Sequence, residues 1–168
     1  MHETPDDLAG LQDLLDRSYA LAGPHLRRII TPERRLTAEQ VSDRLTGMCL
    51  IALATATSDG RPIVGPVDGI FFRGAFHFGS SPDSVRFRHI SARPHVSATY
   101  LPGEELAVTV HGRAVPVEIK SGPFRESLLE VYVPRYGPEW EHDFLDSGPV
   151  YARIEADRMF TFRMAADG

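Results

Sequence analysis

The sequence has very little cysteine and lysine and no asparagine. Among 168 residues there is one cysteine, Cys49, and the 18 basic residues comprise one lysine and 17 arginines. A single cysteine excludes an internal disulfide, so nothing in the chain requires an oxidising compartment. No apolar run approaches the roughly 20 residues of a membrane-spanning helix. The acidic N-terminus, MHETPDDLAG, lacks the basic and then apolar pattern of a secretory signal. We therefore expect a soluble cytoplasmic protein with no membrane partner.

Positive charge and the short motifs of common enzyme classes are also scarce. The net charge of -5 and the pI near 5.8 disfavour nucleic acid as a partner, because phosphate backbones bind to basic surfaces. The chain contains no GxGxxG, GxxxxGK[ST], GxSxG, HExxH or CxxC motif. The seven histidines lack metal-ligand spacing, so we expect no metal site. Cys49 lies in an apolar stretch and is expected to be an inert, buried thiol.

The composition is that of one globular domain. Apolar residues make up 42% and charged residues 24%, in a chain long enough to bury a core. Leucines at three- and four-residue spacing predict a helix over residues 6–22, followed by a connecting segment that contains Pro24 and Pro32. Thr37 and Gln40 form a capping-box pattern that predicts a short helix from that point. We expect an N-terminal helical extension over residues 1–36 and the main domain over 37–168.

Six segments are predicted to be strands. They span residues 49–57, 62–72, 75–80, 95–101, 105–119 and 150–164, and the last is either a strand pair or one bent strand. Short turns are predicted at the pairs Asp59-Gly60, Arg73-Gly74 and Pro102-Gly103. Further helices are predicted over residues 84–92 and 124–137.

The strand pattern predicts the fold class. Pro62 and Pro66 indicate that parts of the second strand are edge-like or bulged. Sequential strands with short turns favour antiparallel pairing, and closure removes exposed edges. We therefore predict a mainly β protein, a six-stranded antiparallel barrel with peripheral helices.

The stretch GSSPDSVRFRH, residues 79–89, is the strongest candidate for a binding site. It ends a strand and begins a helix, and helix N-termini present free N–H groups and a partial positive charge. Ser84 can cap the helix or give its hydroxyl to an anion, and the planar guanidinium groups of Arg86 and Arg88 match phosphate oxygens. From these residues alone, a capped helix with solvated arginines and a phosphate cradle both remain open.

In its wider setting this stretch resembles the pyridoxamine 5'-phosphate oxidase-like family of FMN-binding split barrels. The resemblance covers about residues 37–164 and is carried by LATATSDGRPIVGPVDGIFF, FHFGSSPDSVRFRHISARPHVSATY and ELAVTVHGRAVPVE. The family pattern Ser-x-(Lys/Arg)-x-x-x-(Ile/Leu), followed by a turn and a Val-Ser strand, reads here as Ser84, Arg86, Ile90, Arg93-Pro94 and Val96-Ser97.

The resemblance implies a homodimer with FMN in a groove between the subunits. Ser84 and Arg86 would hold the FMN phosphate, with Arg88 as a second support. Ser80 and Ser81 would line the ribityl chain and the ring.

Two further parts of the chain are implied to contact the ring of the cofactor. Backbone groups near Pro66, Val67 and Asp68 would face the isoalloxazine. Trp140 would close the pocket or pack in the dimer core. The flavin itself would carry the chemistry through N5, so no catalytic side chain is nominated.

The chain departs from the true oxidases of the family in three ways, and the N-terminal extension over residues 1–36 is one of them. Val85 stands where those enzymes often have a basic residue, and the chain ends in DRMFTFRMAADG rather than in their Arg-x-His substrate segment. The resemblance therefore does not extend to pyridoxamine phosphate as the substrate.

Several functions remain open. The leading expectation is an FMN-dependent oxidoreductase of an unidentified small molecule. A reductase that uses the deazaflavin coenzyme F420 belongs to a related branch of the same barrel and also has a basic residue at the position of Arg86. A non-catalytic binder of flavin, haem or a vitamer is a third hypothesis. An oligonucleotide-binding barrel is disfavoured by the negative charge.

Overall fold

The computed structural model describes residues 2–164, and its strands alternate between buried and exposed side chains. In the first strand, β1 Met48–Ala56, every second residue from Cys49 to Thr55 is buried, as expected where one face of a sheet covers a core. The strands are β1 Met48–Ala56, β2 Pro62–Phe72, β3 Ala75–Ser80, β4 His95–Gly103, β5 Leu106–Val117 and β6 Val150–Arg163. The last predicted segment is thus a single strand.

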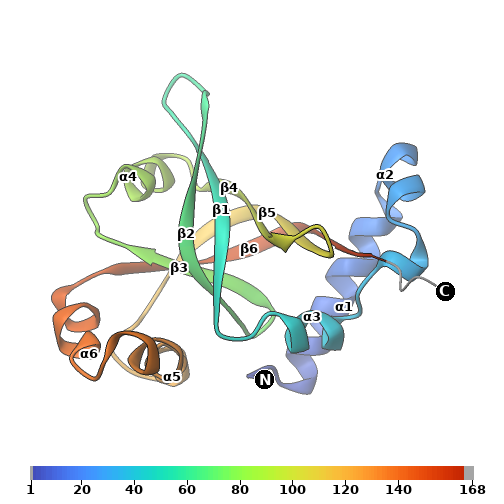
Figure 1. Cartoon of the computed structure of the whole chain (residues 1–168). Coiled ribbons are helices and arrows are strands. Elements are labelled where there is room, and N and C mark those ends of the chain that lie inside the picture. Colours follow the sequence, from blue (N-terminus) through green and yellow to red (C-terminus); the bar gives the residue numbers. More distant parts are fainter. Residues whose placement is uncertain (1, 165–168) are drawn as a thin grey trace.

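All strand pairs are antiparallel, and they close into a barrel in the order β1-β2-β3-β6-β5-β4 (Figure 1). Pairing of β1 with β4, from Ile51 opposite Tyr100 to Ala54 opposite Ser97, completes the ring. The long β5–β6 pair contains an irregularity at Gly112, where an added Cβ would lie 2.1 Å from the Glu155 carbonyl oxygen. The predicted six-stranded barrel with peripheral helices is therefore confirmed.

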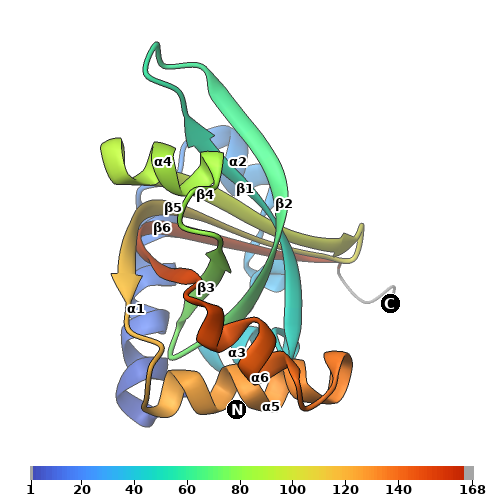
Figure 2. The same cartoon turned by 90° about the vertical axis from the view of Figure 1, so that its left-hand side faces the viewer.

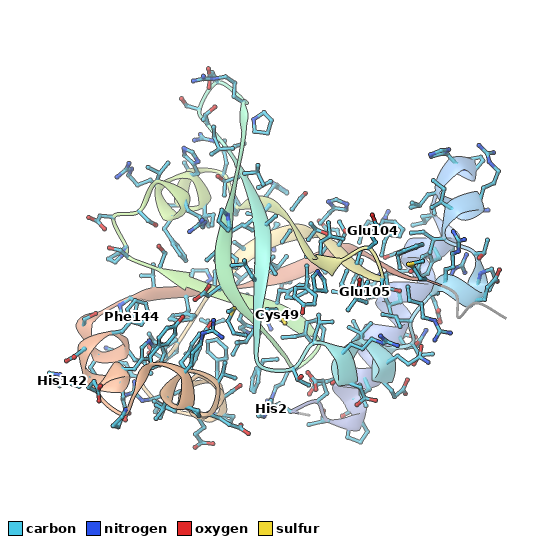
Figure 3. All side chains as sticks on the ribbon, in the orientation of Figure 1. His2, Cys49, Glu104, Glu105, His142 and Phe144 are labelled. Atoms are coloured by element: carbon cyan, nitrogen blue, oxygen red, sulfur yellow. The ribbon has the colours of Figure 1, made fainter. Side chains whose placement is uncertain are left out.

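Two of the three predicted turns are correct and one is displaced. Arg73 and Gly74 have φ values of 48° and 75°, which form the tight β2–β3 turn. Gly60, with φ of 83°, ends the β1–β2 turn, and this hairpin projects from the barrel in Figure 1. The β4–β5 turn lies instead at Glu104 and Glu105, which Figure 3 labels. It is displaced because β4 continues through Pro102 to Gly103, which pairs with Leu106.

The second strand is paired unevenly, as its prolines predicted. Its whole length pairs with β1, but only residues 69–72 also pair with β3. The half that contains Pro62 and Pro66 therefore has one free edge within the described part of the chain. Arg86 of the helix α4, Val85–Ala92, reaches this edge and donates a hydrogen bond to the Pro66 carbonyl oxygen.

Four helical segments precede the barrel. They are α1 Pro5–Ala20, α2 Pro24–Ile29, the 3-10 turn η1 Pro32–Arg34 and α3 Ala38–Arg44. Thr37 and Gln40 form the predicted capping box. The predicted connecting segment is largely helical, because Pro24 and Pro32 each occupy the first helical position, where proline is favourable.

The first helix shares the core of the barrel. Leu11, Leu14 and Leu15 are buried in the same cluster as the strand residues. The Tyr19 hydroxyl lies 2.8 Å from the Thr161 carbonyl oxygen and accepts a hydrogen bond of 2.8 Å from the Thr161 N–H. These contacts attach α1 firmly to β6.

The remaining helices lie at the left-hand end of the molecule in Figure 1, and one of them extends back to the N-terminus, where its Glu130 lies 3.4 Å from His2. They are α4 Val85–Ala92, α5 Pro123–Tyr136, α6 Trp140–Asp143 and the 3-10 turn η2 Leu145–Ser147. Figure 2 turns this end toward the viewer and shows β3 running between α4 and the α5–α6 pair. Residues from all of these elements meet in the candidate site.

Cys49 is fully buried in β1, and burial raises the pKa of its thiol to about 11. The thiol is therefore protonated at neutral pH, as predicted. Within residues 2–164, no helix has the length and apolar character needed to cross a membrane.

Candidate functional site

The candidate site begins where β3 ends and α4 starts. The Ser84 N–H donates to the Ser81 carbonyl over 3.1 Å, which forms a tight turn, and the Ser81 hydroxyl donates to the Asp83 carboxylate. The Ser84 hydroxyl accepts a hydrogen bond of 3.3 Å from the Phe87 N–H. Ser84 is thus the N-cap of α4, and its side chain is already used by the helix.

Arg86 extends from the first turn of α4 to the free edge of β2. Its Nη2 donates to the Pro66 carbonyl oxygen over 2.9 Å. A Cβ added to Gly65 would lie 3.6 Å from the same nitrogen, so the side chain passes close over this part of the strand. Half-burial lowers the pKa of Arg86. Among the described residues, no carboxylate forms a salt bridge with Arg86.

A cavity of about 440 Å³ opens beside Arg86, within the usual size range of small-molecule sites. It lies between α4 and the α5–α6 pair, on the side seen in Figure 2. Six of the nine predicted cofactor-binding residues line it, namely Val67, Asp68, Ser80, Ser81, Arg86 and Trp140. The structure therefore brings together residues from β2, β3, α4 and α6.

The other three predicted residues do not line this cavity. Pro66 contributes its carbonyl oxygen to Arg86. Ser84 borders a smaller hollow of about 210 Å³ that Arg86 also borders. Arg88 borders neither space, and its Nη1 donates to the Asp83 carbonyl over 2.6 Å.

An aromatic wall forms the side of the cavity away from α4. Tyr132 and Trp140 stack with ring centroids 4.8 Å apart, and Trp140 and Phe144 with centroids 5.4 Å apart. Tyr136 extends the stack at the Tyr132 end, with centroids 6.0 Å apart. In Figure 3, Phe144 lies on the side of α6 toward the barrel and His142 on the outer side. The wall presents aromatic rings to the cavity, where they can pack against an apolar part of a ligand.

The aromatic wall crosses a break between two helices, and an ionic contact holds the second helix in place. Arg125 of α5 donates to Glu141 of α6 over 2.6 Å and to Asp146 of η2 over 2.8 Å. Its other guanidinium nitrogen donates to the Ile119 carbonyl over 3.1 Å. The segment that carries Trp140 is thereby fastened to α5.

Sequence analysis did not identify the tyrosines and Phe144 as site residues. Tyr132, Tyr136, Trp140 and Phe144 occur at intervals of four residues, and this spacing is the signal that could have found the wall. Tyr151 could not be identified from the sequence as a cavity residue, because the pairing of β6 with β3 is what brings it to the cavity.

A metal ion in this protein would need several ligand side chains that lie close together. Within the described residues, no group of three or more histidine, cysteine, aspartate or glutamate side chains could hold a metal ion. The site is built instead from one cation, one carboxylate and aromatic rings.

Comparison with known proteins identifies the family. The family model of pyridoxamine 5'-phosphate oxidase matches residues 37–162, which is three quarters of the chain. The chain belongs to this family. The match begins at Thr37, the N-cap of α3, and so leaves α1, α2 and η1 outside it. No curated protein sequence matches significantly.

Solved structures of the pyridoxamine 5'-phosphate oxidase fold resemble the chain over most of their length. A conserved hypothetical protein of Mycobacterium tuberculosis has a TM-score of 0.65 at 20% identity, covering 82% of this chain and 96% of that chain. An F420 reductase has a TM-score of 0.56 at 21% identity and coverages of 70% and 94%. A FAD-binding protein of Mesorhizobium loti has a TM-score of 0.54 at 23% identity and coverages of 76% and 95%. At these identities the similarity concerns the fold.

Proposed function

We propose that this chain binds FMN at the cavity beside Arg86 and acts as a flavin-dependent oxidoreductase of a small molecule. The observation that carries the proposal is Arg86 itself. Its guanidinium is half-buried at the cavity rim and has no carboxylate partner among the described residues. A partly desolvated cation of this kind favours an anionic ligand, and a phosphate group matches its planar donors.

The rest of the cavity fits the remainder of a flavin. Ser80 and Ser81 offer hydroxyl groups close to the end of β3, where a polyol chain would lie. The aromatic rings that include Trp140 offer apolar contacts for the isoalloxazine. Bound flavin supplies hydride transfer through N5, and the protein supplies binding, orientation and exclusion of water. Arg88 is not part of this proposal, because its side chain is directed to the Asp83 carbonyl.

The deazaflavin coenzyme F420 is the alternative cofactor. Structures with this fold include both an F420 reductase and a FAD-binding protein, so the barrel accommodates either ring. Because Val85 is uncharged, Arg86 is the one cation of this pair that can bind phosphate. Both the phosphomonoester of FMN and the phosphodiester of the deazaflavin need such a cation, so Arg86 does not discriminate between the two cofactors. Parallel titrations with FMN and with the deazaflavin decide between the two cofactors.

The subunit arrangement that we propose is a homodimer with the cofactor between the subunits. Exposed Ile63, Val64 and Val85 surround the hollow beside Arg86, an apolar surface that a second copy would cover. We expect Val64→Lys to shift the protein toward monomer in sedimentation velocity and to weaken flavin binding in parallel. Wild-type protein that sediments as a monomer both with and without flavin contradicts this arrangement.

The direct test uses the single tryptophan of the chain, Trp140, whose fluorescence a flavin in the cavity should quench. We expect Arg86→Ala to lose a charge-assisted contact of about 1.5–3 kcal/mol, which is roughly a tenfold to hundredfold loss in FMN affinity. The matched control is Arg88→Ala, which removes the same charge one half-turn away and should bind FMN as the wild type does.

Riboflavin provides an internal check, because it lacks the phosphate. Arg86→Ala should bind riboflavin with unchanged affinity while it loses affinity for FMN. Equal affinity of the wild type and Arg86→Ala for both FMN and the deazaflavin would refute the role of Arg86. Tight binding without turnover against electron acceptors would favour the non-catalytic binder.

A further inference from the structure

Two tyrosines in the cavity wall have hydroxyl groups without a protein partner. Tyr132 of α5 and Tyr151 of β6 are only 4% and 6% exposed, and both line the cavity. Within residues 2–164, neither phenolic oxygen forms a hydrogen bond. In the same residues, Thr31 has the one side-chain polar atom that is both fully enclosed and without a partner. The two phenolic oxygens therefore retain some accessible surface, and both residues line the cavity, while Tyr151 also borders a second hollow beside Pro116 and Leu145.

The strand register directs the Tyr151 hydroxyl toward Asp68. Tyr151 pairs with Gly79 on β3, and Gly79 lies one residue beyond Phe78, which pairs with Gly69 on β2. Asp68, Gly79 and Tyr151 thus follow one another across three strands. A Cβ on Gly79 would lie 2.5 Å from Tyr151 Cζ, so the hydroxyl end of the ring crosses the strand at this glycine. The ring can take this course because Gly79 has no side chain.

Asp68 also influences both hydroxyl groups electrostatically. Burial is the main cause that raises the pKa of Tyr132, and the neighbouring Tyr151 and Asp68 add to it. Burial and then Asp68 raise the pKa of Tyr151. Both phenols therefore remain protonated at neutral pH and can donate hydrogen bonds, whereas an ionised Asp68 carboxylate can only accept them.

This arrangement leaves both hydroxyl groups free to bind a ligand. Tyrosine hydroxyl groups of largely buried residues usually have a hydrogen-bond partner, and these two have none among the described residues. The cavity lining thus presents two hydroxyl donors and one carboxylate acceptor. A complementary group has two acceptors and one donor, and an imide provides them side by side as carbonyl, N–H and carbonyl.

We propose that Tyr132, Asp68 and Tyr151 bind the imide edge of the cofactor ring, with the two phenols donating to its carbonyl oxygens and Asp68 accepting from its N3–H. The inference rests on the proposed function and deepens it, since it assigns the ring end of the cavity opposite the anion end at Arg86. FMN and deazaflavins both carry this edge, whereas haem and nicotinamide carriers do not. The triad thus selects the class of ring, and Arg86 selects the phosphate.

The test uses two probes without phosphate, riboflavin and 3-methylriboflavin, so that Arg86 does not enter the measurement. Binding is followed by quenching of Trp140 fluorescence. Methylation removes the N3–H donor, and the wild type should bind 3-methylriboflavin about tenfold more weakly than riboflavin, the size expected for one hydrogen bond to a charged group. In Asp68→Ala this preference should disappear.

Removal of single hydroxyl groups tests the two donors. Tyr132→Phe and Tyr151→Phe keep the ring and should each weaken riboflavin binding by roughly threefold to tenfold. Tyr100→Phe, on β4 and outside the cavity, is the matched control and should bind as the wild type does. A second readout is the pH at which N3–H of bound riboflavin ionises, seen in its absorption spectrum, which the Asp68 carboxylate should raise.

The outcomes separate this inference from the proposed function. If the wild type binds none of FMN, deazaflavin and riboflavin, the proposed function itself is wrong. If riboflavin and 3-methylriboflavin bind equally well to the wild type, flavin binding stands and the imide assignment is overturned. That comparison needs no variant, so it remains decisive even where a substitution impairs folding.

Discussion

The buried imidazole of His77 packs behind the cavity and makes the free energy of unfolding decrease at acid pH. The ring of His77 packs against that of Phe124 of α5, with ring centroids 4.5 Å apart. The ring centroids of Phe124 and Tyr151 are 5.8 Å apart. The Nδ1–H of His77 donates to the Ala75 carbonyl over 3.0 Å. Burial lowers the pKa of His77 from 6.5 to about 4, and the positive charge of Arg153 adds slightly to this shift. The folded protein therefore holds His77 neutral.

The direction of the pH effect follows from this lowered pKa. Between pH 6.5 and about 4 the unfolded chain binds a proton at His77 that the folded chain does not. Stability from this group is present above pH 6.5 and falls by about 1.4 kcal/mol per pH unit as the pH drops through the window. The total is about 3 kcal/mol, of which about 2 kcal/mol is lost between pH 7 and pH 5.

Urea unfolding at pH 7 and pH 5 measures this loss. His77→Phe keeps an aromatic ring between Phe72 and Phe124 but cannot titrate, so its free energy of unfolding should fall by about 2 kcal/mol less than that of the wild type over this range. The exposed His95→Phe is the control and should retain the wild-type pH dependence. Equal losses in the wild type and His77→Phe would show that the imidazole is not neutral in the fold.

Three further predictions concern the core and the cavity. Cys49, with its pKa raised to about 11 by burial, should resist thiol reagents at pH 8 in the native state and react in urea, as absorbance assays would show. Tyr19→Phe leaves the buried Thr161 N–H without its acceptor and should lower the free energy of unfolding by about 1–3 kcal/mol in urea titrations. Gly79→Ala places a methyl group 2.5 Å from the Tyr151 ring and should displace it into the cavity, so FMN titration should show weaker binding while circular dichroism shows a folded barrel.

Much of the fold could be predicted because it depends on short-range patterns. Arg73-Gly74 could be placed as a turn because glycine tolerates positive φ, and Thr37 with Gln40 marked a helix start through their own hydrogen bonds. The β4–β5 turn was misplaced because Pro102-Gly103 has the composition of a turn, whereas the pairing of Gly103 with Leu106 kept both residues in the strand. There, long-range pairing outweighed the local preference.

In the candidate site, too, local features could be predicted from the sequence and long-range contacts could not. Arg86 was a candidate anion ligand because its position in the first turn of a helix is a local property, but those residues alone left solvated arginines open, and the family resemblance favoured the phosphate role. Trp140 also came from the family resemblance. The aromatic partners of Trp140 were present in the sequence at a spacing of four, but a helix break separates them, so only the folded α5–α6 pair establishes that they stack.

By itself the sequence determined the strand segments, most turns and helix starts, and the arginine at the start of α4, since each depends on residues within a few positions of one another. The tertiary structure decided which distant residues share a cavity. Barrel closure placed the Pro66 carbonyl under Arg86, and the register of β2, β3 and β6 brought Tyr151 across Gly79 toward Asp68. A shift of one residue in either strand pair would turn these side chains to the opposite face. The chemistry of the cavity is therefore a consequence of strand register, which spacing along the chain does not reveal.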